Sequence, residues 1–144
     1  MLAELKAATF EVLETMYFLF PETLEEERSV RGPFLRAWVT IAGPKSLRVG
    51  LLVPESLAHK MAANFLGVTE EEIYKPEMED ALKETANMMA GALLSRMEAS
   101  GAFTLKTPEA QWIAADGQKP KPPANRLLFE VEDEVLEIFV EKVS

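Results

Sequence analysis

The 144-residue chain contains no cysteine and only one histidine. The lack of cysteine excludes disulfide bonds, a thiol nucleophile and cysteine-ligated metals. His59 has no second histidine that could join it as a metal ligand, so we interpret it as a surface or half-buried residue rather than a ligand or a base. Nucleotide-binding GxxxxGK[ST] and GxGxxG motifs, the HExxH zinc motif and the GxSxG nucleophile motif are also absent. No metal site and no cofactor of its own are therefore expected on this chain.

Positive charge and long apolar runs are scarce as well. The chain has 15 Lys and Arg residues against 24 Asp and Glu residues, a net charge of −9, which argues against nucleic acid and anionic membranes as partners. No segment approaches the ~18 uncharged apolar residues that a membrane helix needs. Glu4 and Glu11 interrupt the N-terminal stretch where a signal peptide would need an apolar run. We expect a cytoplasmic protein that binds neither nucleic acid nor a membrane.

The apolar residues are spaced as in a single α+β domain covering residues 1–144. Apolar steps of three and four predict three helices, at residues 2–20, 55–66 and 76–99. In the first helix the predicted apolar stripe is Leu2, Leu5, Thr9, Val12, Leu13, Met16 and Phe20, and Pro21 ends it. Alternating apolar residues predict strands at 34–42, 45–53, 102–106, 111–114, 127–131 and 135–140, with an exposed hairpin loop at 115–125. This order predicts an antiparallel-rich sheet packed with long helices.

The helix at Asp80–Arg96, DALKETANMMAGALLSR, is apolar over most of its circumference but carries one polar stripe. The stripe consists of Asp80, Glu84, Asn87 and Gly91, which step by four, three and four residues and so share one helix face. Asn and Gly are poor residues for a helix interior. The pattern is typical either of a compact polar site or of the solvent face of a buried helix.

An amide and a carboxylate one turn apart favour a particular kind of chemistry. The Asn87 amide offers one acceptor and two donors, so it can hold a water in a defined direction, but it has no useful basicity. Such a site would act by aligning water with an electrophile that is already reactive. Glu84 could anchor a cation on the other molecule.

The motif Asp80-x3-Glu84-x2-Asn87, followed by Pro108, resembles the signature of the CheC/CheX/FliY family. These proteins are phosphatases of bacterial chemotaxis and flagellar-switch systems. Residues 10–20 resemble the first helix of the family, and residues 39–67 resemble its hairpin followed by a helix that ends in Leu-Gly. With one motif in a short chain, CheX is the closer relative. The interval from Asn87 to Pro108 is slightly short and the hairpin turn is less glycine-rich, which indicates a diverged member.

The resemblance implies a CheC-like fold and hydrolysis of the phospho-aspartate of a phosphorylated CheY-type receiver domain. Asn87 would orient the attacking water, and Glu84 would pair with the active-site lysine of the receiver. Asp80 would lie at the edge of the partner contact, and Gly91 would let the partner backbone approach. The Mg²⁺ ion would belong to the receiver.

Two other functions remain open from the sequence. The chain could be a non-catalytic protein-binding domain of the same fold, like the flagellar switch protein FliM, which lacks the Glu/Asn pair. It could also serve a signalling system other than chemotaxis. CheX relatives form homodimers by extending the sheet across two subunits, so we expect a homodimer, with the strand at 135–140 as a candidate unpaired edge.

Overall fold

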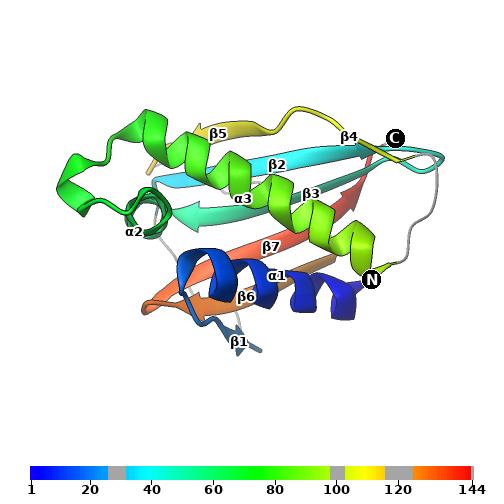
Figure 1. The fold of residues 1–144 in the computed structure, drawn as a ribbon, viewed down its shortest axis with the longest axis horizontal. Coiled ribbons are helices and arrows are strands. Elements are labelled where there is room, and N and C mark those ends of the chain that lie inside the picture. The colour runs from blue at the N-terminus through cyan, green and yellow to red at the C-terminus, as the bar shows by residue number, and fades with distance from the viewer. Residues whose placement is uncertain (26–31, 98–102, 116–124, 144) are drawn as a thin grey trace.

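The computed structural model describes residues 1–25, 32–97, 103–115 and 125–143, which form one antiparallel sheet packed against helices (Figure 1). The helices are α1 (Leu2–Tyr17), α2 (Glu55–Leu66) and α3 (Lys75–Arg96), with the 3-10 turn η1 (Glu70–Glu72) before α3. The strands are β1 (Glu22–Leu24), β2 (Phe34–Ala42), β3 (Leu47–Pro54), β4 (Thr104–Leu105), β5 (Glu109–Ile113), β6 (Asn125–Val131) and β7 (Glu134–Lys142). The predicted α+β class and antiparallel-rich sheet are confirmed.

The strands follow the order β1-β6-β7-β3-β2, and β4 and β5 both pair with β2. Figure 1 shows α1 and α3 side by side across one face of the sheet, with α2 toward one end. α1 packs on β6, and α3 packs on β2 and β3. Among the described residues, no helix combines the length and apolar character needed to cross a bilayer.

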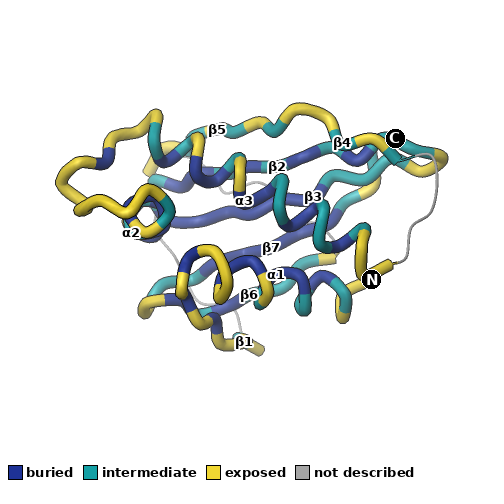
Figure 2. Tube along the Cα trace, viewed as in Figure 1, coloured by how far each residue is buried: buried dark blue, intermediate teal, exposed yellow. Residues whose placement is uncertain are grey.

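The core lies between the sheet and the helices. Strand β2 supplies four side chains with no exposed surface: Leu35, Ala37, Val39 and Ile41. They alternate along the strand and so share one face, as the sequence predicts. Helix α3 supplies eight buried residues: Met78, Ala81, Leu82, Thr85, Ala86, Met89, Ala90 and Leu93. In Figure 2 the buried positions run along the central strands beneath α1 and α3.

Helix α1 ends earlier than predicted, and this changes which residues are buried. The helix stops at Tyr17, because Phe18 turns into the left-handed region with φ 56°. The chain then leaves the helical period, so Leu19 enters the core at 2% exposure while Phe20 is 71% exposed. Met16 is also exposed. The predicted inward positions of Met16 and Phe20 are therefore wrong, and Tyr17 and Leu19 take their place.

Strand β7 is central, which overturns its predicted role as an unpaired edge. It pairs with β3 on one side and with β6 on the other. Its residues from Leu136 to Val140 are buried on both faces, as expected of an interior strand. Glu137, at 4% exposure, is accommodated by an ion pair with Arg126, whose guanidinium nitrogen lies 2.8 Å from the carboxylate. The short edge strand β1 is not predicted by the apolar pattern of the chain.

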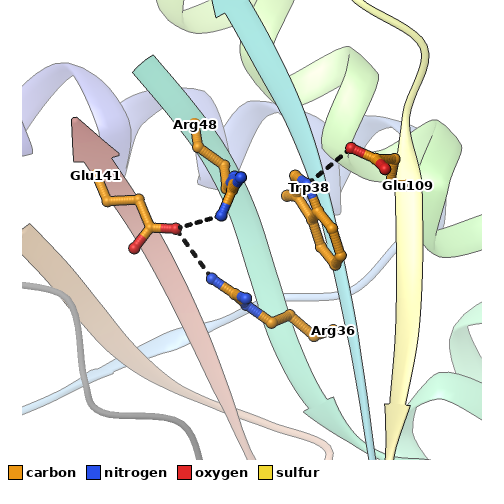
Figure 3. Close-up of polar contacts among 5 residues, drawn as sticks. All are labelled: Arg36, Trp38, Arg48, Glu109 and Glu141. Carbon is orange, nitrogen blue, oxygen red and sulfur yellow. Dashed lines mark hydrogen bonds and ion pairs between the residues drawn. The ribbon is translucent and has the colours of Figure 1, made fainter. Parts of the chain in front are cut away.

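The sheet face away from the helices carries a polar and aromatic network (Figure 3). The Glu141 carboxylate accepts hydrogen bonds from Arg36 at 3.0 Å and from Arg48 at 3.2 Å. Both guanidinium groups lie over the Trp38 ring, 5.1 and 5.4 Å from its centroid. The Trp38 indole donates to Glu109 at 3.1 Å. These contacts explain why polar and aromatic residues alternate with apolar ones along the central strands.

Several predicted boundaries shift or fall outside the described residues. α3 begins at Lys75 and ends at Arg96, short of the predicted residue 99. Most of the predicted loop at 115–125 lies outside the described ranges. His59 is half-buried, as expected, and its Nε2 donates to the Ile73 carbonyl at 3.0 Å.

Candidate functional site

The polar stripe lies on the outward face of α3. The helix starts after Tyr74, whose backbone N–H donates to the Glu77 carboxylate at 2.9 Å. This contact, with Pro76 in the first turn, fixes the helix start. Its buried residues face the sheet and α1. At 100° per residue, Asp80, Glu84, Asn87 and Gly91 lie opposite the centre of that buried face.

All four stripe residues can be reached from solvent. Asp80 and Glu84 are exposed, while Asn87 and Gly91 are partly exposed. Within the described part of the chain, no hydrogen bond or ion pair engages the side chains of Asp80, Glu84 or Asn87. A Cβ placed on Gly91 would meet no atom within 4 Å beyond its chain neighbours and the nearby backbone of its own helix. The face therefore combines unengaged polar groups with open space beside them.

Tyr17 of α1 holds the inner side of this part of α3. Its hydroxyl donates to the Ala81 carbonyl at 3.1 Å and also lies in hydrogen-bond contact with the Thr85 hydroxyl. The Thr85 hydroxyl lies 2.8 Å from the same carbonyl, so its single proton is shared between the Ala81 and Tyr17 oxygens. Burial raises the pKa of Tyr17 to about 12; the Thr85 hydrogen bond opposes this rise, and the negative charge of Glu84 adds to it. Tyr17 thus remains neutral and fixes the turn that carries Asp80 and Glu84.

Strand β5 holds the other flank of α3. The Trp112 indole donates to the Glu79 carboxylate at 3.1 Å, and the Lys75 ammonium lies 5.0 Å from the Trp112 ring centroid. With contacts from α1 on one side and β5 on the other, the helix cannot roll freely. The sequence pattern does not indicate these supporting residues, because each acts across a long sequence separation.

The site offers few chemical functions of its own. Glu84 provides an anion, and Asn87 provides an amide that can donate and accept. No group of three or more His, Cys, Asp or Glu residues within the described ranges is arranged to hold a metal ion. The chemistry that these residues can perform is to orient a water molecule and to pair with a cation on another molecule.

Comparison with known families identifies the chain. The family model described as chemotaxis phosphatase CheX matches residues 35–115. The chain belongs to the CheX family. The match begins within β2, ends after β5 and contains all of α3. The CheX resemblance predicted from the helix motif and the hairpin is confirmed. No curated protein sequence matches the chain.

Solved structures confirm the CheX-type fold. CheX from Desulfovibrio desulfuricans superposes with a TM-score of 0.76 at 20% identity, over 98% of this chain and 97% of that chain. CheX from Vibrio vulnificus gives 0.73 at 20% identity, over 96% and 95%. A CheX–CheY–BeF3–Mg²⁺ complex from Borrelia burgdorferi gives 0.72 at 16% identity, over 99% and 97%. At these identities the likeness establishes the fold, while the roles of individual residues remain predictions.

Proposed function

We propose that this CheX-family protein hydrolyses the phospho-aspartate of a CheY-type receiver domain, in the cytoplasm, in chemotaxis or related two-component signalling. Residues 1–144 act as one CheX-like phosphatase domain. The observation that carries the proposal is the exposed face of α3, where Glu84 and Asn87 lie together without partners among the described residues. The family description as a chemotaxis phosphatase supports it, and so does the fold shared with a CheX bound to CheY.

In the proposed mechanism Asn87 aligns water with the phosphorus of the acyl phosphate. The water oxygen bonds to phosphorus as the bond between phosphorus and the aspartate carboxyl oxygen breaks. The aspartate leaves as a carboxylate with the electron pair of that bond, and the water protons pass to inorganic phosphate and solvent. No strong base is needed, because the acyl phosphate is already reactive and the Asn87 amide acts by orientation.

The other stripe residues place the receiver. Glu84 forms an ion pair with the active-site lysine of the receiver, Asp80 contacts its edge, and Gly91 admits its backbone because no side chain stands there. The acidic pocket of the receiver would hold the Mg²⁺ ion, which would supply neutralisation of phosphoryl charge there. The residues of this chain act on the water and on the approach of the partner.

The rate acceleration that the reaction requires is small enough for a site of so few residues to supply. An acyl phosphate hydrolyses without a catalyst, so a hundredfold acceleration requires only about 2.7 kcal/mol of barrier lowering. One oriented amide and one ion pair can supply that much. A stable phosphate ester would demand far more, which favours a phospho-aspartate as the substrate.

The decisive experiment follows phosphate release from a phosphorylated CheY-type receiver with and without the protein. We expect acceleration by the wild type, loss of acceleration in Asn87→Ala, and a raised KM in Glu84→Ala. Lys45→Ala, in the exposed turn between β2 and β3 and away from α3, serves as the control and should retain activity. If the wild type binds receivers without accelerating phosphate release, the non-catalytic, flagellar-switch-like function replaces this proposal. If the wild type is active and Asn87→Ala is equally active, the stripe is not the catalytic site.

We also propose that the protein is a homodimer. Within the described sheet, β5 pairs only with β2, so its outer edge is open, whereas β7 is enclosed. An open edge strand is a template for pairing with a second chain. Sedimentation equilibrium should give twice the mass of the chain, and Gln111→Lys, which adds a charge at an exposed position of β5, should shift the mass toward that of one chain.

A further inference from the structure

The end of α1 exposes two phenylalanine side chains that folding does not explain. Phe18 is 77% exposed and Phe20 is 71% exposed, while Leu19 between them is 2% exposed. Phe18 also adopts φ 56°, a left-handed conformation that glycine adopts freely and that is unfavourable for a bulky residue. A glycine at this position would suit the fold better. The large exposed ring therefore indicates a role outside the protein's own core.

Two more exposed apolar residues lie at the same corner of the molecule. The Asn64 side chain, near the end of α2, donates to the backbone carbonyl of Tyr17 at 3.1 Å, and the Tyr17 and Phe65 ring centroids are 5.8 Å apart. The ends of α1 and α2 therefore meet. Leu66 and Val68, which follow this contact, are 48% and 37% exposed. We call these four residues the apolar corner: Phe18, Phe20, Leu66 and Val68.

The apolar corner adjoins the stripe on α3. Tyr17 immediately precedes Phe18, and its hydroxyl reaches the Ala81 carbonyl, next to Asp80 and one turn before Glu84. Adjacent Cα atoms are about 3.8 Å apart, so Phe18 lies within roughly 15 Å of this turn. One partner in a standard interface covers about 800 Å², a patch roughly 30 Å across. A partner patch of this size that covers Asp80 and Glu84 can therefore also reach Phe18.

Carboxylates surround the apolar corner and indicate the charge of its partner. Glu14 lies one turn before Phe18 on α1 and is exposed. Glu70 and Glu132 line the hollow beside Leu19. The nearby Lys60 in that hollow is already paired, 3.5 Å from the Glu134 carboxylate. This pattern fits a partner surface that presents apolar groups beside basic ones.

We propose that the apolar corner is the second half of the receiver-docking surface, with Phe18 as its anchor in an apolar depression flanked by basic groups on the receiver. The proposal rests on the proposed function, because it places the same receiver over both the stripe and the corner. Asn87 then orients the water and Glu84 pairs with the receiver lysine, while Phe18 contributes affinity and selects among receivers. Aromatic anchors beside a polar site commonly dominate the energetics of an interface.

Phe18→Gly tests the anchor without endangering the fold, since glycine accepts φ 56°. We expect unchanged or higher thermal stability, an unchanged kcat and about a tenfold increase in KM for the phosphorylated receiver. Met97→Ala removes a 39% exposed apolar side chain at the other end of α3 and serves as the control, with no change in KM. An active wild type whose KM is unaffected by Phe18→Gly would overturn the docking proposal while leaving the phosphatase proposal intact.

A binding assay separates the two proposals further. With the receiver held in a stable beryllofluoride and Mg²⁺ form, Phe18→Gly should raise Kd about tenfold even if turnover is too slow to follow. If binding is unchanged, or if Phe18→Gly instead dissociates the protein into single chains, the corner serves no receiver and the proposal fails. If the wild type does not hydrolyse the phosphorylated receiver but its binding still depends on Phe18, only the catalytic function is contradicted.

Discussion

The Tyr17 hydroxyl donates a hydrogen bond to the Ala81 carbonyl, 3.1 Å away and 64 positions along the chain. It joins the last residue of α1 to the turn of α3 that carries Asp80 and Glu84. The same carbonyl accepts a second hydrogen bond from Thr85. Tyr17 has no exposed surface, so water cannot replace these contacts if they are lost. The position of the candidate site on α3 therefore depends on α1.

Tyr17→Phe should destabilise the protein by about 1 kcal/mol, because the change removes one buried hydroxyl but leaves Thr85 to satisfy the Ala81 carbonyl. The expected fall in Tm is about 3–5 °C. Tyr74→Phe, at a side chain with 69% exposure, is the matched control and should leave Tm unchanged. An equal effect of both variants in a calorimetric scan would show that the Tyr17 contact contributes nothing.

Alkaline pH should weaken the fold through the same residue. The pKa of Tyr17 rises from its ordinary 10.0 to about 12 because the hydroxyl is buried. Between these values the unfolded state has lost the proton and the folded state still holds it, so stability falls as pH rises. One unit corresponds to about 1.4 kcal/mol, and the full loss by about pH 12 is about 2–3 kcal/mol.

The measurement is urea unfolding of wild type and Tyr17→Phe at neutral pH and at about pH 11. The wild type should lose about 1 kcal/mol more than the variant on this change of pH, since phenylalanine cannot ionise. Parallel losses in the two proteins would place the alkaline sensitivity on other groups.

The pattern of the sequence predicted the fold class and most elements because apolar periodicity is a local property. The alternation in β2 and the three- and four-residue steps of α3 are written within each segment, and both elements occur as predicted. The end of α1 was missed because it depends on Phe18 adopting a left-handed conformation that nothing in its residue type favours. β7 was assigned to an edge because strand order depends on contacts between distant segments, which alternation does not encode.

The residues of the candidate site are likewise predictable from the sequence, but the contacts that support them are not. The spacing predicts that four residues share one helix face, because residues three or four apart always do so in a helix: Asp80, Glu84, Asn87 and Gly91. Their shared exposure depends on how α3 lies against α1, β2 and β3. The supporting contacts of Tyr17 with Thr85 and of Trp112 with Glu79 arise only after the chain folds. Periodicity therefore predicts which residues can meet a partner but not what holds them in place.

Gly50 of β3 should not tolerate even a methyl group. A Cβ at this position would clash with the Ala37 carbonyl oxygen and would lie 2.6 Å from the Phe139 ring and 2.9 Å from the Trp38 Cβ. Gly50→Ala must shift backbone as well as side chains, so we expect a loss of about 2–3 kcal/mol in unfolding free energy. Urea denaturation measures it, and a change below about 0.5 kcal/mol would mean that the sheet adapts at little cost.

At Gly91, unlike Gly50, the fold has room for a side chain. Substitutions there therefore distinguish effects on stability from effects on the approach of the receiver. Because a Cβ there meets nothing within 4 Å, Gly91→Ala should stabilise α3 by about 1 kcal/mol through better helix propensity. Gly91→Trp should fold as well, yet its bulk would fill the space that a receiver needs beside Asn87. We expect kcat/KM to fall several-fold for Gly91→Ala and at least tenfold for Gly91→Trp, about 1.4 kcal/mol, because each side chain occupies space that the receiver backbone needs. Full activity of a correctly folded Gly91→Trp would show that the receiver does not approach over this part of α3.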